Sequence, residues 1–194
     1  MTLCARAIVV STGLLAAMAM ASPALNEALA FDQTYELEGI GFHIHSANNS
    51  SLNLLTITPH GLELDNSPLT VEIAGSISGA EIADLDVDGS PEIYVYVNSA
   101  GSGSYGSLVA YAVNNGKSLS EIYLPAVNEN DEAANGYMGH DQFAVVENTL
   151  VQRFPIYRDG DTNSEPSGGT RQLQYRLEAG EANWVLRLER VVEY

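Results

Sequence analysis

Apolar and polar residues alternate along most of the chain after residue 30, which is the pattern of β-strands with one buried face. The clearest run covers residues 93–97, where β-branched and aromatic residues follow one another. No segment keeps a helical period over three turns, and only the polar residues 128–135 allow a short helix or a loop. The pattern predicts strands at residues 34–44, 52–58, 69–73, 81–85, 92–98, 107–113, 142–147, 150–157, 171–177 and 184–190.

Turn-forming residues separate these runs. Glycine, proline and asparagine mark turns at residues 58–62, 87–91, 114–117 and 178–183. Residues 158–169 form a long polar loop without core residues, and loops of this length are often functional or mobile. The spacing therefore predicts one all-β domain over residues 31–194, an antiparallel β-sandwich or barrel-like fold with long polar loops.

The first 30 residues have the pattern of a signal peptide. Arg6 supplies the positive charge, residues 7–20 form an apolar run too short to span a membrane, and small residues follow. Cleavage is expected after Ala30, or alternatively after Ala21. Either site removes Cys4, the single cysteine of the chain, so no disulfide is expected in the exported protein. We expect export to a bacterial periplasm.

The charge balance limits the classes of partner. The chain has 25 acidic and 8 basic residues, a formal net charge of −17. Nucleic-acid binding requires basic groups that neutralise phosphates, so nucleic acid is excluded as a partner, and anionic membrane surfaces are disfavoured for the same reason. A basic protein would be attracted by the long-range field, although solubility alone is the alternative explanation of the charge.

Residues 84–89, DLDVDG, begin like a calcium-binding loop. Carboxylates at alternating positions can converge on a hard cation. An EF-hand would need glutamate at the position of Val95, so that version fails, whereas a shorter loop would close at Glu92. The candidate ligands are thus Asp84, Asp86, Asp88 and Glu92, and the alternative is an exposed turn between strands. A calcium- or ligand-binding β-module of the cell envelope is the second candidate function.

Two further patterns carry little chemistry. His43 and His45 lie two residues apart on one expected strand face, but two imidazoles alone make a weak zinc site, so we expect structural or surface histidines. The sequence GSGSYG at residues 101–106 superficially matches the nucleophile elbow of hydrolases. That elbow lies between a strand and a helix, whereas a strand is expected to follow here.

The glycine-rich segment NSAGSGSYGS, residues 98–107, joins two expected strands and holds one bulky residue, Tyr105. Glycine and serine allow a close backbone approach to another surface, and tyrosine offers apolar area and a hydroxyl at low entropic cost. From the residues alone, Tyr105 either contacts a partner or folds back onto the sheet.

Residues 102–105, Ser-Gly-Ser-Tyr, match the Ser-Gly-x-Tyr motif of bacterial periplasmic lysozyme inhibitors. Around this motif the chain resembles the periplasmic inhibitors of invertebrate-type (I-type) lysozyme. The similarity covers most of the chain after the signal peptide. It is carried by the segments GFHIHSANNSSLNLLTITPHGLELDNS, ADLDVDGSPEIYVYVNSAGSGSYGSLVAYAVN, KSLSEIYLP, GYMGHDQFAVVE and FPIYRDGDTNSEPSGGTRQLQY.

The resemblance implies a β-sandwich-like protein without enzymatic activity. Separately, no cofactor is expected, and no metal other than the calcium alternative at residues 84–92. The resemblance also implies that Ser102, Gly103, Ser104 and Tyr105 form an inhibitory loop that enters the active-site cleft of an I-type lysozyme. Ser102 and Tyr105 would be the inserted side chains, with Gly103 as the tight backbone between them. Arg171 either supports the binding surface or has a structural role, which we favour. A homodimer is also expected, because edge strands need cover.

Overall fold

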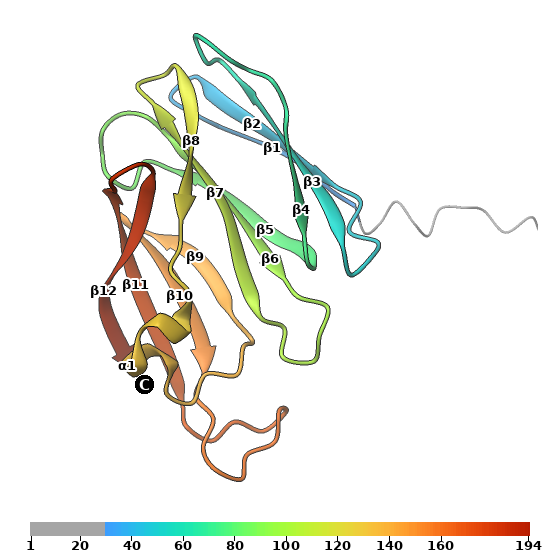
Figure 1. Ribbon diagram of the computed structural model, residues 1–194, viewed down its shortest axis with the longest axis vertical. Coiled ribbons are helices and arrows are strands. Elements are labelled where there is room, and N and C mark those ends of the chain that lie inside the picture. The colour runs from blue at the N-terminus through green and yellow to red at the C-terminus, as the bar shows by residue number, and fades with distance from the viewer. Residues whose placement is uncertain (1–29) are drawn as a thin grey trace, which may run out of the picture.

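The computed structural model describes residues 30–194 and consists of two β-sheets (Figure 1). The smaller sheet has the order β1-β2-β3-β4 and the larger one the order β5-β6-β7-β8-β12-β11-β10-β9. In the smaller sheet the strands are β1 (Phe31–Leu37), β2 (Ile40–Ser46), β3 (Asn53–His60) and β4 (Leu69–Ile73). In the larger sheet they are β5 (Ser76–Ala83), β6 (Glu92–Asn98), β7 (Gly106–Asn114), β8 (Ser118–Tyr123), β9 (Gln142–Val146), β10 (Thr149–Pro155), β11 (Thr170–Ala179) and β12 (Trp184–Glu193).

Strand pairing is antiparallel except between β8 and β12, where Trp184 and Val185 pair in parallel with the end of β8. The connection that follows β8 carries the 3₁₀ helix η2 (Val127–Glu129) and the short helix α1 (Asp131–Ala134). Of the two alternatives left open for residues 128–135, a short helix or a loop, the structure has short helices. No helix within residues 30–194 is both long and apolar enough to cross a membrane.

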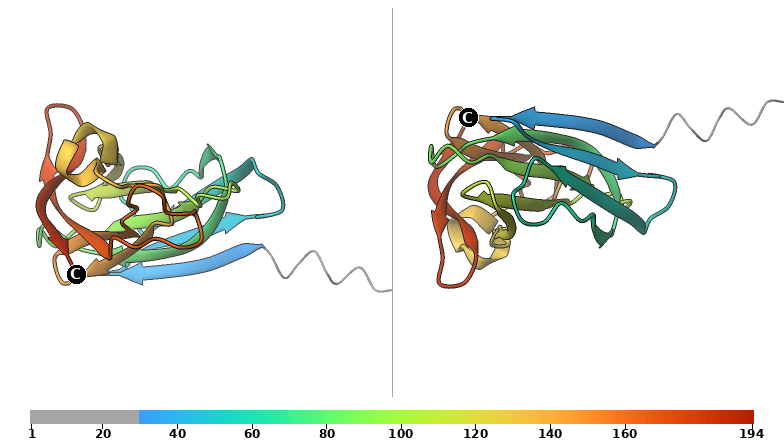
Figure 2. Two further views of the ribbon diagram at one scale, coloured as in Figure 1. Left: turned by 90° about the horizontal axis from the view of Figure 1, so that it is seen from below. Right: turned by 90° about the horizontal axis from the view of Figure 1, so that it is seen from above.

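The larger sheet curls until its two edge strands, β5 and β9, approach each other. Glu81 of β5 joins them, because its Oε2 accepts hydrogen bonds from the Val145 amide at 2.9 Å and from the Tyr96 hydroxyl at 2.5 Å. The Tyr96 and Phe143 rings stack beside this bridge. The fold is thus all-β, as predicted, and combines a barrel-like curled sheet with a second sheet packed on it (Figures 1 and 2).

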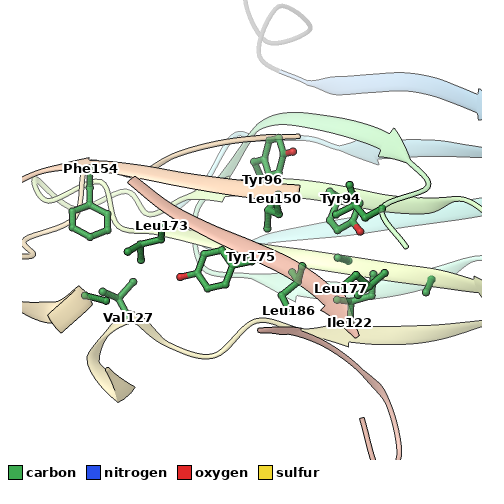
Figure 3. Packing of buried hydrophobic residues seen from close by; sticks show 14 residues of the cluster. Tyr94, Tyr96, Ile122, Val127, Leu150, Phe154, Leu173, Tyr175, Leu177 and Leu186 are labelled. Carbon is green, nitrogen blue, oxygen red and sulfur yellow. The ribbon is translucent and has the colours of Figure 1, made fainter. Parts of the chain in front are cut away.

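Strand β6 explains how one sheet serves two cores. Ile93, Val95 and Val97 point into a core shared with the four-stranded sheet. Tyr94 and Tyr96 point the other way, into the core enclosed by the curled sheet (Figure 3). The alternation of aliphatic and tyrosine residues along this strand therefore reflects burial on both faces, and the strand holds the base of the loop that follows it.

The predicted strands at 69–73 and 92–98 have the observed bounds, and most others differ only at their ends. One expectation was wrong: residues 34–44 are not one strand but belong to β1 and β2, separated by a tight turn. Glu38 and Gly39 both have positive φ there, 53° and 77°, as a two-residue hairpin turn requires, and glutamate rarely signals this conformation. Strand β8 was missed, and β5 begins earlier than predicted.

The predicted signal peptide and its cleavage site at Ala21 lie outside the described residues, which begin at Ala30. The predicted homodimer also stays a prediction. Among the described strands, β1 and β4 each keep one edge of the smaller sheet without a ladder partner.

Candidate functional site

The glycine-rich loop leaves β6 at Asn98 and enters β7 at Gly106, the last pair of that antiparallel ladder. The loop closes on itself, because the Ser99 amide donates to the Tyr105 carbonyl at 2.9 Å and the Ser104 amide donates to the Gly101 carbonyl at 3.0 Å. Ser104 adopts a φ of 41°, which completes the tight turn. The loop projects from the end of the two strands (Figure 1). The residues predicted to form the inhibitory loop therefore lie together at a compact tip.

Two neighbouring segments hold the backbone of this tip. The His140 amide donates a hydrogen bond to the Gly103 carbonyl at 2.7 Å. The Asn163 side-chain amide donates to the Ser102 carbonyl at 2.8 Å, and Asn163 Oδ1 also contacts His140 Nε2 at 3.2 Å. Within residues 30–194, the hydroxyls of Ser102 and Tyr105 have no hydrogen-bond partner. The backbone of the motif is thus fixed while these two hydroxyls stay available.

The Tyr105 side chain is 48 % exposed and rests with one edge on the Tyr137 ring, at a centroid distance of 5.7 Å. Tyr137 in turn packs against Phe154 at 4.6 Å, which belongs to the core. Aromatic pairs of this geometry contribute about 0.5–1.5 kcal/mol beyond the area that they bury. Tyr105 therefore rests on the domain with one edge and keeps about half of its surface open to solvent, and its contact with a partner stays a prediction.

Glycines are required where the supporting segment meets the motif. A Cβ added at Gly139, whose φ is +87°, would lie 2.2 Å from the Gly103 carbonyl oxygen. A Cβ at Gly103 would lie 2.6 Å from Cε2 of Tyr105. A larger residue at Gly139 would displace the Gly103 backbone, and one at Gly103 would displace the Tyr105 ring, so these two glycines set how closely the motif sits against residues 137–140.

Asp141 anchors the second end of the loop and is almost completely buried. Its Oδ2 accepts hydrogen bonds from the Gly106 amide at 2.7 Å and from the Tyr137 hydroxyl at 2.8 Å. Its Oδ1 accepts from the Gln152 side chain at 2.7 Å, and Gln152 is held by Tyr175. Burial raises the pKa of Asp141, and the hydrogen bonds oppose this shift. Sequence reasoning missed Asp141, since its bond to the motif loop, at Gly106, spans 35 residues of the chain.

The long polar loop predicted at residues 158–169 is present between β10 and β11 and reaches the motif through Asn163. The backbone carbonyl of Asn163 accepts a hydrogen bond from the Tyr157 hydroxyl at 2.9 Å, and the Tyr157 ring stacks on the His140 ring. Asp161 binds the loop internally through the amides of Arg158 and Ser167, and these bonds lower its pKa. The loop is therefore ordered by its own contacts and braces the motif from one side.

A groove of about 600 Å³ opens beside the tip. Tyr105 and Tyr137 line one side of it, and Tyr123, Leu124 and Pro125 from the segment after β8 line another. The rings of Tyr105 and Tyr123 are both about half exposed, so the groove presents aromatic surface next to the motif.

Arg171 is only 3 % exposed and binds the segment that leads to Tyr137. It donates to the carbonyls of Ala133, at 2.8 Å, and Asn135, and it pairs with Glu193 at 2.6 Å. These contacts match the structural role that we favoured. Any effect of Arg171 on a bound protein would pass through the backbone that it holds, and its supporting role there stays a prediction.

The predicted calcium ligands are only partly brought together. Carboxylate oxygens of Asp84, Asp86 and Asp88 lie within 4.8 Å of one another. Glu92 instead points into the core, where its Oε2 accepts hydrogen bonds from the Leu85 amide at 2.8 Å and the Tyr94 hydroxyl at 3.3 Å. Burial raises the pKa of Glu92 to about 8, and Asp86 and Asp84 add to the shift. Calcium binding by this turn stays a prediction. Only the three aspartates are placed for it, because the Glu92 carboxylate is hydrogen-bonded in the core.

The chain matches a protein-family model described as periplasmic lysozyme inhibitor of I-type lysozyme, over residues 66–135. This match confirms the resemblance noted in the sequence and includes the whole glycine-rich loop. The supporting residues His140, Asp141 and Asn163 lie beyond the matched region. No curated protein and no solved structure matches the chain.

Proposed function

We propose that the protein is a periplasmic inhibitor of I-type lysozyme and that its Ser102–Tyr105 loop enters the active-site cleft of the enzyme. The observation that carries this proposal is the placement of the motif. Two side chains with available hydroxyls, Ser102 and Tyr105, sit on a tip whose backbone is hydrogen-bonded to two other loops. The family match supports the inhibitor class and the periplasmic location.

Bracing of the tip favours insertion into a cleft. Binding orders loops at an entropic cost, and a loop already held in its bound conformation avoids most of that cost. The contacts of Gly103 with His140 and of Ser102 with Asn163 restrain the loop before any encounter. In addition, Tyr105 can lose little freedom on binding because its ring already rests on Tyr137.

The chemistry of the tip fits the cleft of a glycoside hydrolase. Such a cleft holds a carboxylic acid and a carboxylate on either side of the bond that is cleaved. The hydroxyls of Ser102 and Tyr105 can donate hydrogen bonds to carboxyl oxygens, as sugar hydroxyls do, and the tyrosine ring can fill a sugar subsite. Inhibition is then occlusion without a covalent step, and the protein itself needs no catalytic residue.

The acidic charge of the chain is consistent with a basic target. A net charge of −17 accelerates the encounter with a positively charged enzyme and makes the association rate fall with added salt. The partner is thus another protein, and the inhibitor would protect the peptidoglycan of the cell that exports it.

A turbidity assay with bacterial cell walls tests the proposed class and target together. The protein is added to a panel of invertebrate-type, chicken-type and goose-type lysozymes at equal activity. We expect selective inhibition of the invertebrate-type enzyme. Equal inhibition of all three, or of none, would contradict the proposal.

A further inference from the structure

The outer face of the four-stranded sheet carries a cluster of one carboxylate and two imidazoles. Asp32 of β1 lies opposite His45 of β2 in the ladder, and His43 lies two residues earlier on the same face. The neighbours Phe42 and Ile44 point inward and are fully buried, so both histidines face outward. In both views of Figure 2 the strand β1 lies on the outside of the molecule, so this face is open to solvent.

The Asp32 carboxylate contacts both imidazoles, one through each of its two oxygens. His43 Nε2 donates to Asp32 Oδ1 at 2.9 Å, and His45 Nδ1 lies 3.3 Å from Asp32 Oδ2. A third histidine, His60, covers Gly41 on the adjacent strand, so three of the four histidines of the chain share this face.

We propose that Asp32, His43 and His45 form a surface site for a divalent transition-metal ion such as zinc. Imidazole and carboxylate are ligands of this class of metal, and three protein ligands leave further positions for water. Two ligands of a tetrahedral zinc ion with bonds of about 2.0 Å lie roughly 3.3 Å apart. Each imidazole nitrogen lies at about this distance from one oxygen of Asp32, and the two nitrogens would have to approach each other to share an ion.

The remaining adjustment is a rotation of the rings. The imidazole centroids of His43 and His45 are 6.5 Å apart, with 23° between their planes. Both side chains are more than 40 % exposed, so they can turn toward a shared ion without disturbing the core. A bound ion would tie β1 to β2 and would stabilise the folded protein by mass action. The site uses a face different from the glycine-rich loop and does not depend on the proposed inhibition.

Isothermal titration with zinc chloride tests the site in untagged protein that has been treated with EDTA. We expect one saturable site and a higher melting temperature with zinc. His43→Gln and His45→Gln are each expected to weaken binding at least about tenfold, since even indirect partners of metal ligands change affinity by roughly 10–100-fold. Asp32→Asn should act in the same direction.

Two controls separate this site from other candidates. His140→Asn removes an imidazole elsewhere and keeps a side chain that tolerates its positive φ of 59°. Asp84→Asn disrupts the acidic turn. Both should bind zinc like the unmodified protein. The proposal is overturned if zinc shows no saturable binding, if the His43 and His45 variants bind normally, or if either control variant loses binding equally.

Discussion

Asp141 and Gly106 are joined by a 2.7 Å hydrogen bond from the Gly106 amide to the Asp141 carboxylate, between residues 35 positions apart in the chain. The same oxygen accepts the Tyr137 hydroxyl, so one buried carboxylate fixes both the end of the motif loop and the ring on which Tyr105 rests. The motif therefore depends on residues outside the stretch that identifies it.

The first prediction concerns this carboxylate. Asp141→Asn keeps the shape but sets an amide against groups that all donate to Asp141, so at least one buried donor loses its partner, which costs about 1–3 kcal/mol. We expect a lower melting temperature and weaker inhibition of I-type lysozyme. Asp159→Asn, at an exposed site, is the matched control and should change neither. Unchanged inhibition by Asp141→Asn would contradict the claim that Asp141 holds the motif loop for binding.

Gly139 gives a second prediction, because it approaches the motif without being part of it. Gly139→Ala should push the Gly103 carbonyl away and reduce inhibition by at least about tenfold, the effect of losing 1.4 kcal/mol of binding free energy. Gly39→Ala has a similar positive φ but open space around it, so it carries the backbone strain without the clash. Equal inhibition constants for the two variants would show that the approach of Gly139 does not matter.

Asn163 provides a third prediction, on the long polar loop. Asn163→Ala removes the hydrogen bonds that the Asn163 side chain makes to Ser102 and His140. Because Asn163 is exposed, the stability of the domain should change little, but the motif loop loses one of its supports. We expect the amides of residues 99–105 to exchange their hydrogens faster than in the unmodified protein. The affinity for lysozyme should fall, mainly through faster dissociation. Asn148→Ala, at an exposed turn, should leave both measurements unchanged. If Asn163→Ala behaves like this control, the brace is not functional.

The fourth prediction is that the buried carboxyl group of Glu92 makes the free energy of unfolding depend on pH. Its pKa is about 8 in the folded protein and 4.5 in its reference state, so between these values the folded state holds a proton that the unfolded chain releases. The free energy of unfolding should therefore fall as pH rises from 5 to 8, by up to about 1.4 kcal/mol per pH unit. Urea unfolding should show a flatter profile for Glu92→Gln than for the exposed control Glu132→Gln. Parallel profiles would contradict the assignment.

Local patterns predicted the strands and turns well where a short stretch of sequence carries the signal by itself. The alternation at residues 92–98 gave the bounds of β6, and the asparagine and glycine at residues 115–116 gave the turn before β8. Strand β8 itself was missed, because its sequence SLSEIY has only two strongly apolar residues and relies on pairing with β7 and β12.

The candidate site divides in the same way. Ser102 and Tyr105 could be chosen because their motif is contiguous. Asp141 and Asn163 could not, because their roles arise from contacts across 35 and 61 residues that no local pattern encodes. Likewise, Glu92 looked like a fourth calcium ligand from its spacing, and only the direction of its side chain into the core separates it from the acidic turn.

The inhibition constant of a double variant, Ser102→Ala with Tyr105→Ala, against an I-type lysozyme tests the central claim most directly. The control is Ser51→Ala with Tyr194→Ala, which removes the same two side-chain types from exposed positions elsewhere. We predict a large loss of inhibition for the first variant, with a melting temperature close to that of the control. Normal inhibition by the Ser102 and Tyr105 variant would contradict insertion of the loop.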